Sequence, residues 1–566
     1  MFESLQAKAS KILCAEYDIS DCSVLWERPD QAAFGDLATP VAMQLARLLK
    51  KNPKIIAGLL AEKLSEDSSV EKAEVAGPGY VNVWLKPEAL LRELSCTRAA
   101  CTARVTKKED PVIIDYSAPN IAKPLGIHHI LSTVIGQVIG NLYRHNGAPV
   151  VAVNHIGDWG TQFGKLAIAF ELWGNKDSVD QCTVEDLLAL YVRFHDAAEK
   201  DASLEEKGQE AFRKLEQGDK ALRAFWEKVV SITLRELGAL YTRLHVEFDH
   251  TQGESFYEDK MKPIIEEGKK KHVFVAGEKG ALVVQYPEDT GLPPAIVVKA
   301  DGATIYMTRD LATVRYRMDT WKPQSVLYVV DIAQELYFRQ LFAAVRMLGW
   351  DPPKLEHVQF GRMRFADKSM STRKGNILRL EEVLDEAVKR AGELIKSRGD
   401  SIQTDDPEAL ADMMGTGAVV YGILSQNRQS ELIFDWDRML SFEGNSAPYL
   451  QYTHARARSV LRKAESNADV SLPTEVSSLT ESERSLVGAL LRFPEALEEA
   501  RKGHLPHTLT HYLYQLCQQF NSFYSSEPIL QSPEPQKTLR LALTALTATV
   551  LKCGAELLTL RVPDRM

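Results

Sequence analysis

The sequence predicts an α/β protein with a parallel, doubly wound central sheet, preceded by a small α/β domain and followed by an all-α domain. Short apolar runs, each followed by polar residues, occupy residues 112–116, 150–153, 326–330 and 357–360. Helical patterns fill the intervals, as expected of parallel strands joined by crossover helices. After residue 440 the pattern is overwhelmingly helical. In such sheets the functional site lies at the carboxyl ends of the strands.

Length and composition narrow the class of protein. The chain has 566 residues, of which 45% are apolar and 26% charged, and indicates about three or four globular domains. The net charge of −9 argues against an undiscriminating nucleic-acid binder but allows a local basic surface. Seven cysteines without a C-x-x-C pair predict neither a disulfide framework nor structural zinc. With no secretory signal and no uninterrupted apolar span, we expect a cytoplasmic protein without membrane partners.

The predicted small α/β domain covers residues 1–105. Its expected elements are helices at 39–49 and 53–64 and a strand within 73–85. Tyr80, Asn82 and Trp84 fall on one side of that strand, because successive side chains alternate. Spacing alone favours ordinary packing for Tyr80 and Trp84.

The stretch from residue 112 to residue 147 combines a strand, a polar loop and an amphipathic helix. Apolar residues recur at helical spacing over residues 130–142. The loop therefore opens a helix at the carboxyl end of a strand, where backbone N–H groups and the helix dipole attract anions. The polar residues at this helix mouth are Asn120, Lys123, His128 and His129.

Two later segments carry further candidate residues. Residues 295–307 predict a hairpin that delivers Tyr306 and Asp310 to the start of another helix. By its position alone, Asp310 fits a helix N-cap. Residues 368–376 form a loop rich in positive charge, whereas the charged helical segment at 183–246 reads as a solvated face.

A basic helix follows two tyrosines in the C-terminal part. Residues 454–463 carry arginine and lysine but no acidic residue, and Tyr449 and Tyr452 precede them. Aromatic and basic side chains together suit RNA bases and phosphates. One basic helical face is also common in other proteins, and the pattern alone leaves both interpretations open.

Several segments together resemble the arginyl-tRNA synthetases, a family of class I aminoacyl-tRNA synthetases, in their bacterial type. In chain order they are SAPNIAKPLGIHHILST, NHIGDWGTQFGKL, YMTRDLA, DIAQELYFRQLF, KSMSTRKGN, FDWDRMLSFEGNSAPYLQYTHAR and VPDRM. The N-terminal PGYVNVWL is similar to that family's additional domain, so the resemblance spans nearly the whole chain.

The resemblance implies a two-step reaction on a Rossmann-type catalytic domain. The carboxylate of L-arginine attacks the α-phosphate of ATP, held with Mg²⁺, and gives arginyl-adenylate and pyrophosphate. The arginyl group then passes to the 3′ end of tRNA(Arg), and AMP is released. Positioning and stabilisation of phosphate charge should dominate the first step. Family members commonly need bound tRNA before they activate arginine, and we expect the same here.

The resemblance also assigns roles to individual residues. The catalytic set is Lys123, His128, His129 and Lys368. The ATP-binding set is Gly126, His128, His129, Lys368, Ser369, Met370 and Ser371. The arginine-binding set, in which carboxylates receive the guanidinium, is Asn120, Glu254, Tyr306, Asp310 and Gln334. The tRNA-binding set is Tyr80, Asn82, Tyr449, Tyr452 and Met566.

The implied domains follow the family's order. They are an N-terminal domain at 1–105 that contacts the tRNA elbow, a catalytic domain at 106–375, a linking region at 376–440 and an anticodon-binding domain at 441–566. The resemblance further implies a monomer.

Three positions depart from the family's motifs. The usual His-x-Gly-His reads Gly126-Ile127-His128-His129, so an imidazole stands where the family's glycine leaves room for the adenine. We therefore expect a shifted loop or a narrower nucleotide site. The usual Lys-Met-Ser-Lys reads Ser-Met-Ser-Thr at 369–372, and Lys123 matches the lysine that compensates in such family members. Tyr337 replaces a family histidine, which predicts a further change near the nucleotide.

Two alternative interpretations have less support in the sequence. Another class I synthetase, such as the cysteinyl or glutamyl type, is disfavoured because zinc-ligand cysteines are missing and YMTRD is present. A catalytically silent tRNA-binding paralogue draws its support from the altered helix-mouth motif. Intact Asn120, Lys123, Glu254, Asp310 and Gln334 argue against it.

Overall fold

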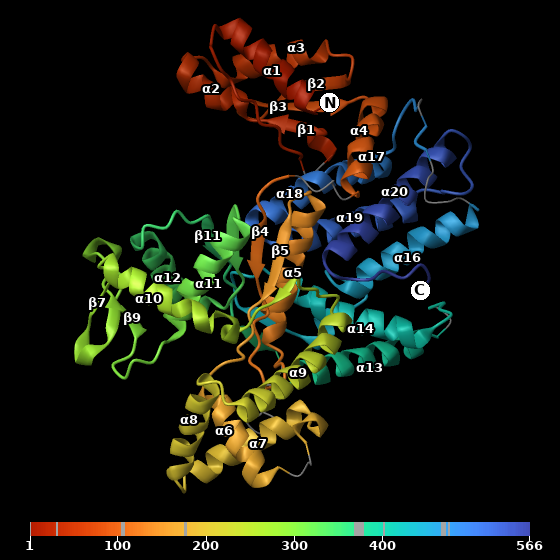
Figure 1. Cartoon of the computed structure of the whole chain (residues 1–566). Coiled ribbons are helices and arrows are strands. Elements are labelled where there is room, and N and C mark those ends of the chain that lie inside the picture. The colour runs from red at the N-terminus through yellow and green to blue at the C-terminus, as the bar shows by residue number, and fades with distance from the viewer. Residues whose placement is uncertain are drawn as a thin grey trace.

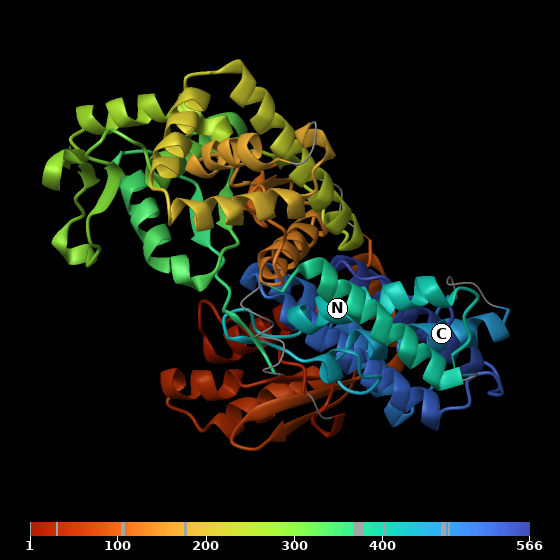
Figure 2. The same ribbon diagram turned by 90° about the horizontal axis from the view of Figure 1, so that it is seen from below.

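The computed structural model describes residues 2–29, 32–102, 108–174, 178–366, 378–399, 402–465, 471–473 and 476–566. A small N-terminal unit and a central sheet both contact a helical C-terminal unit (Figure 1). Seen from below, the insertions of the central part project away from the C-terminal helices (Figure 2).

The N-terminal unit is a three-stranded antiparallel sheet of order β1-β3-β2 with helices packed on it. Its elements are α1 (Phe2–Tyr17), η1 (Ala32–Phe34), β1 (Leu37–Thr39), α2 (Val41–Leu49), α3 (Pro53–Ser65), β2 (Val70–Ala76), β3 (Tyr80–Leu85) and α4 (Pro87–Ala100). The helix predicted from residue 39 begins later, because residues 37–39 pair with β3 as a strand. The predicted small α/β unit is confirmed.

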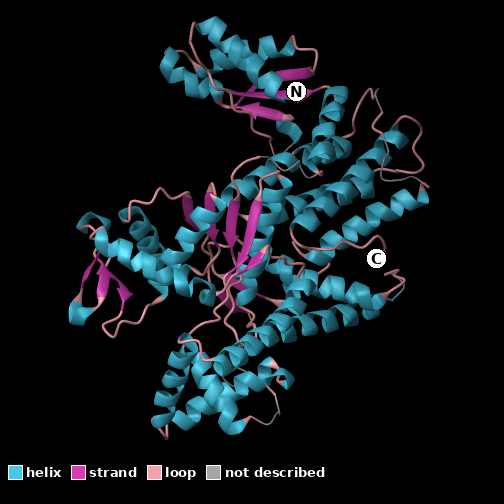
Figure 3. Ribbon diagram, in the orientation of Figure 1, coloured by secondary structure: helices cyan, strands magenta, loops and turns pink. Residues whose placement is uncertain are grey.

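Five strands form the central parallel sheet, in the order β11-β10-β4-β5-β6 (Figure 3). They are β4 (Val112–Asp115), β5 (Val150–Asn154), β6 (His250–Thr251), β10 (Ser325–Tyr328) and β11 (Lys354–His357). Every neighbouring pair is parallel, which confirms the predicted sheet. The chain leaves β4 for β5 on one side and later returns to β10 on the other. The crevice at the carboxyl ends of β4 and β10 is therefore a topological switch point, where such sheets bind ligands.

Helix α5 (His129–His145) runs from the carboxyl end of β4 and is buried along most of its length. It contacts β4 and β5 as well as helices of the C-terminal unit. Near its end, the Tyr143 hydroxyl lies 2.9 Å from His504 Nε2, and His504 Nδ1 lies 2.9 Å from Glu356 Oε1 of β11. The helix therefore joins the predicted site to the C-terminal unit.

Insertions separate the remaining strands. Between β5 and β6 lie α6 (Thr161–Trp173), η2 (Val179–Gln181), α7 (Val184–Ala198), α8 (Ser203–Glu216) and α9 (Lys220–Arg243). Between β6 and β10 lie η3 (Glu254–Lys260), α10 (Met261–Lys270), β7 (Phe274–Ala276), η4 (Glu278–Gly280), β8 (Leu282–Val284), η5 (Glu288–Thr290), β9 (Ala295–Val298) and α11 (Tyr306–Trp321). Between β10 and β11 lie η6 (Ile332–Gln334) and α12 (Glu335–Met347). The predicted hairpin at 295–307 is reduced to one bridge between Val298 and Thr304, because β9 pairs with β8.

In its described residues the C-terminal unit is helical apart from a parallel pair, β12 (Met363–Phe365) and β13 (Leu432–Phe434). Its helices are α13 (Leu380–Arg398), α14 (Pro407–Leu424), α15 (Trp436–Met439), α16 (Ala447–Lys463), α17 (Glu481–Leu491), α18 (Phe493–Gly503), α19 (Pro506–Ser526) and α20 (Gln536–Leu557). The apolar stretch after residue 539 forms most of α20 and is largely buried, as predicted. Within the described ranges, no helix combines the length and the apolar composition needed to cross a membrane.

Two glycines of α5 test how closely this helix approaches β4. A Cβ at Gly136 would lie 2.3 Å from Tyr116 Cβ, whereas one at Gly140 would meet its nearest neighbour, Arg144 Nη1, at 3.4 Å. We predict that Gly136→Ala lowers the free energy of unfolding by about 1–3 kcal/mol, because the helix must move. Gly140→Ala should be neutral or stabilising by up to about 1 kcal/mol, since alanine favours helix. Urea unfolding followed by tryptophan fluorescence measures both, and equal destabilisation by the two variants would contradict the close approach.

Candidate active site

The mouth of α5 is held by the chain that follows residue 377. Gly126 forms an antiparallel bridge with Arg379, and the Ile127 N–H donates to the Leu378 carbonyl at 2.9 Å. The loop that opens α5 therefore pairs with the residues that follow the segment 367–377. Four predicted site residues lie in that segment, outside the described residues: Lys368, Ser369, Met370 and Ser371.

Two histidine rings lie together at this mouth. The centroids of His128 and His129 are 4.0 Å apart. His129 Nδ1 lies 3.1 Å from the Gly126 nitrogen and 3.2 Å from the Gly126 carbonyl oxygen, and it accepts the Gly126 N–H in the tautomer that carries the ring proton on Nε2. Desolvation and the neighbouring His128 lower the pKa of His129 to about 4, so the ring is neutral at pH 7. A neutral Nε2–H group at a helix N-terminus can donate to an anion.

The helical insertion approaches the same mouth through α7. Lys123 is exposed, and its Nζ lies 5.3 Å from the centre of the Tyr191 ring. Arg379 Nη1 lies 2.5 Å from Glu185 Oε1 on the same helix. Both cationic side chains are thus held beside the mouth by α7, through a cation–π contact and an ion pair.

Buried charges gather at the carboxyl ends of β4, β5 and β6 and on the facing helix α11. Four of these residues are at most 9% exposed, and the acids outnumber the arginines. We name this group the charge cluster; it consists of Asp115, Asp158, Glu254, Arg309, Asp310 and Arg317.

Two ion pairs compensate half of the acids in the charge cluster. Arg317 Nη2 lies 2.7 Å from Asp115 Oδ2, and the arginine side chain is completely buried. Arg309 Nη1 lies 3.3 Å from Glu254 Oε1. Buried charges are retained in proteins when they are paired in this way.

Neutral groups hold the other two acids. Asp158 accepts hydrogen bonds from the Ser255 N–H at 2.8 Å and from the Ser255 hydroxyl at 2.6 Å. Gly253 permits this approach, because a Cβ there would lie 2.4 Å from Asp158 Cγ. Asp310 Oδ2 accepts a hydrogen bond from the Tyr337 hydroxyl of α12. Asp158 thus fixes the turn that carries Glu254, while Tyr337 fixes Asp310.

The charge cluster contains fewer arginines than acids, and the pKa values of Glu254 and Asp310 are raised. Desolvation raises the pKa of Glu254 to about 7, although Arg309 opposes the shift. Desolvation also raises the pKa of Asp310 to about 6, against the hydrogen bond from Tyr337. A bound cation would lower both values, and a planar guanidinium can meet two carboxylates at once.

The other residues predicted to bind arginine lie around the charge cluster and not within it. Tyr306 is the first residue of α11 and is 68% exposed. Gln334 is exposed and directly precedes α12, whose first turn carries Tyr337. Asn120 is exposed and forms a bridge with the loop after β5. Because Ile305 caps α11, the alternative interpretation of Asp310 as an N-cap is wrong.

Part of this geometry was not predicted from the sequence. Asp115 and Arg317 were not among the predicted site residues. Tyr337 was expected near the nucleotide, whereas the Tyr337 hydroxyl donates a hydrogen bond to Asp310. The segment NHIGDWG contains Asp158 and was the available signal for that residue. A buried arginine such as Arg317 gives no comparable signal, because helical spacing does not distinguish it from surface arginines nearby.

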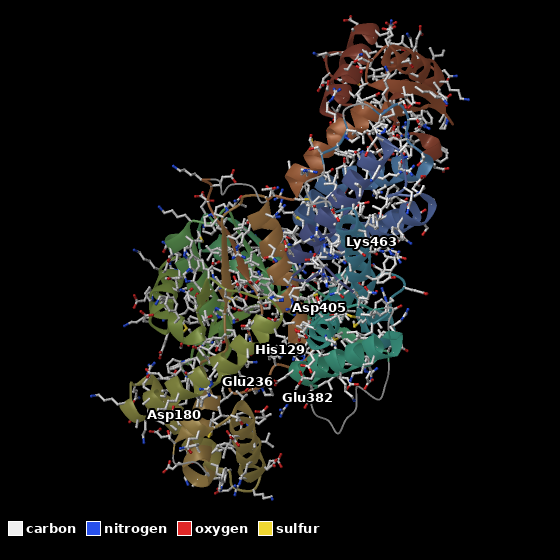
Figure 4. All side chains as sticks on the ribbon, turned by 90° about the vertical axis from the view of Figure 1, so that its right-hand side faces the viewer. His129, Asp180, Glu236, Glu382, Asp405 and Lys463 are labelled. Atoms are coloured by element: carbon white, nitrogen blue, oxygen red, sulfur yellow. The ribbon has the colours of Figure 1, made fainter. Side chains whose placement is uncertain are left out.

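A cleft of about 1280 Å³ opens between α16, the chain between α19 and α20, and the C-terminus. Its lining combines aromatic, basic and carboxyl groups and includes Asp405, Tyr452, Arg456, Arg462, Lys463 and Met566. Tyr449 lies one turn before Tyr452, and its hydroxyl accepts a hydrogen bond from Asn521 Nδ2 at 3.0 Å. Figure 4 looks onto the side of the molecule on which His129, Asp405 and Lys463 are seen together.

The two residues predicted in the N-terminal unit differ in exposure. Tyr80 is half-buried at the start of β3. Asn82 is only 5% exposed and lies in the middle strand of the sheet. The tRNA contacts of Tyr80 and Asn82 stay predictions.

Comparison with known proteins accounts for nearly the whole chain. Residues 93–436 match the family model described as tRNA synthetases class I (R), catalytic domain. Residues 450–566 match the DALR anticodon binding domain, and residues 2–85 match the arginyl tRNA synthetase N terminal domain.

Curated relatives and solved structures agree with these matches. The arginine–tRNA ligase of Fusobacterium nucleatum is 40% identical over 94% of both chains, and that of Alkaliphilus metalliredigens is 38% identical over 95% of both. The arginyl-tRNA synthetase structure from Thermus thermophilus has the same fold, with a TM-score of 0.82, 24% identity and 100% coverage of both chains. The one from Plasmodium falciparum gives a TM-score of 0.80 at 23% identity over 99% of both chains. The chain therefore belongs to the arginyl-tRNA synthetase family of class I aminoacyl-tRNA synthetases.

Proposed function

We propose that the mouth of α5 and the charge cluster are the two ends of one active site. Family membership supplies the reaction, in which ATP is used to attach L-arginine to tRNA(Arg). The observation that carries the assignment is an acidic cluster short of cations beside an anion-binding helix terminus, at the carboxyl ends of parallel strands. One end suits a guanidinium and the other suits a phosphate.

At the arginine end, Glu254 and Asp310 receive the guanidinium. Their raised pKa values support this role, since a bound cation would supply the charge that the charge cluster lacks. Tyr306 lines the rim of the pocket, and Asn120 and Gln334 hold the amino and carboxylate groups of the substrate. Citrulline, which lacks the charge, and lysine, which lacks the planar fork, would leave buried carboxylates without matched partners.

At the ATP end, His129 Nε2–H donates to an α-phosphate oxygen and stabilises the charge that develops there as the arginine carboxylate attacks. His128 and Gly126 border the nucleotide, and the narrower adenine site remains a prediction. Lys123, which α7 holds beside the mouth, acts on the phosphates, together with Lys368, Ser369, Met370 and Ser371.

Mg²⁺ would enter with ATP and neutralise phosphate charge. In the part of the chain that the structure describes, no group of three or more His, Cys, Asp or Glu side chains could hold a metal by itself. The ion would therefore be held chiefly through the phosphates.

The cleft beside α16 is proposed as the anticodon site, with Tyr452 and Met566 in its lining and Tyr449 one turn away. Tyr80 and Asn82 would contact the tRNA elbow from the N-terminal unit. The domain boundaries at about residues 105, 375 and 440, the monomeric state and the cytoplasmic location remain predictions that accompany this assignment.

The guanidinium contact can be tested on two aspartates of the same helix. Asp310→Asn removes a proposed charge-assisted bond, so the KM for arginine should rise about 10- to 100-fold while the KM for ATP stays within about twofold. Asp319→Asn is the matched control, because Asp319 is exposed on α11 and pairs with Arg315. Aminoacylation kinetics measure both variants. An unchanged KM for arginine in Asp310→Asn would remove Asp310 from the site.

The second prediction concerns the dependence of activation on tRNA. Because α5 connects the helix mouth to the C-terminal helices, binding in the cleft should favour the active arrangement of the mouth. Arginine-dependent exchange of pyrophosphate into ATP should therefore rise at least about tenfold when tRNA(Arg) is added. Periodate-oxidised tRNA(Arg), which binds but accepts no arginine, separates binding from transfer. Full exchange in the absence of tRNA would refute the dependence.

A further inference from the structure

We propose that Tyr337 is a positioning residue of the arginine site, whose hydroxyl orients the carboxylate of Asp310 toward the substrate. The inference rests on the proposed contact between Asp310 and the guanidinium. It gives a role in substrate selection to a residue at which this chain departs from its family's motif.

The contact joins two helices that meet at the charge cluster. Tyr337 lies in the first turn of α12, and its hydroxyl donates to Asp310 Oδ2 on α11. Desolvation and the adjacent Asp310 raise the pKa of Tyr337 well above its usual value, so the hydroxyl stays protonated and donates. The bond engages one oxygen of the carboxylate and leaves the other to a ligand.

The neighbouring charges explain why a neutral donor suits this place. Arg317 is paired with Asp115, and Arg309 is paired with Glu254. A cationic partner for Asp310 would cancel the charge that the substrate needs, whereas a phenol holds the carboxylate and leaves its charge in place. The charged and titratable groups that influence Asp310 and Tyr337 are Asp115, Glu254, Tyr286, Arg309, Arg317 and Tyr328.

The same turn connects the two ends of the substrate. Gln334, the proposed contact to the amino acid's backbone groups, directly precedes the helix that carries Tyr337. The Tyr337 hydroxyl therefore connects Asp310, the proposed guanidinium contact, to the segment that contains Gln334. Loss of this hydrogen bond should weaken the binding of arginine and leave the binding of ATP unchanged.

The test compares Tyr337, which lies on α12 and donates to Asp310, with Tyr286, whose hydroxyl donates to α12. Tyr337→Phe should raise the KM for arginine about tenfold, the scale of a lost hydrogen bond to a charged group, with kcat and the KM for ATP within about twofold. Tyr286→Phe is the matched control, since Tyr286 is 3% exposed and its hydroxyl donates to the Gln340 carbonyl at 2.8 Å. This control should leave the KM for arginine unchanged.

A double variant shows whether Tyr337 acts through Asp310. In the Asp310→Asn background, Tyr337→Phe should have no further effect on the KM for arginine. A rise in the KM for ATP instead, or equal effects of the two Phe variants, would overturn the proposal. If Asp310→Asn raises the KM for arginine and Tyr337→Phe does not, the role of Tyr337 alone fails. If neither raises it, the proposed guanidinium contact fails as well.

Discussion

The shortage of positive charge among the buried acids at the carboxyl ends of β4 and β5 is the constraint on which the arrangement of the site depends. Carboxylates removed from water need partners, and among the described residues of the charge cluster arginines pair with Asp115 and Glu254 only. Asp310 receives a phenol and keeps a raised pKa. Folding thus leaves a place for one more cation, and the planar guanidinium of the substrate fits that place better than an ammonium does.

Strand β4 places the acidic charge cluster next to a site that attracts negative charge. Its last residue, Asp115, belongs to the charge cluster, and the loop that follows it opens α5. The positive end of a helix therefore lies beside an excess of carboxylates, which suits a substrate that is cationic at one end and is joined to a phosphate at the other. The far end of α5 meets His504, so the same helix links this chemistry to the C-terminal helices.

Elements whose structure depends on local residues could be predicted from the sequence, whereas features that depend on distant partners could not. Strands β4, β5 and β10 and helix α5 could be predicted because their apolar periodicity is a property of short segments. The run predicted at 357–360 overlaps β11 at one residue, and the two-residue strand β6 was not predicted. β1 was missed, since three residues carry no period. Alternation placed Asn82 on the same side of β3 as Tyr80, but it does not reveal how far that side is covered, and Asn82 is only 5% exposed. The roles of Glu254 and Asp310 came from resemblance, and the partner of Asp310, Tyr337, needed the packing of α12 against α11.

Proton release on arginine binding tests the central claim most directly. The pKa values of Glu254 and Asp310 are about 7 and about 6 in the free protein, and a bound guanidinium favours their ionised forms. Isothermal titration calorimetry in buffers of different ionisation enthalpy, at a pH between these two values, should show protons released on binding. Affinity should fall as the pH is lowered through this range. Binding without proton release, at an affinity independent of pH, would contradict the account.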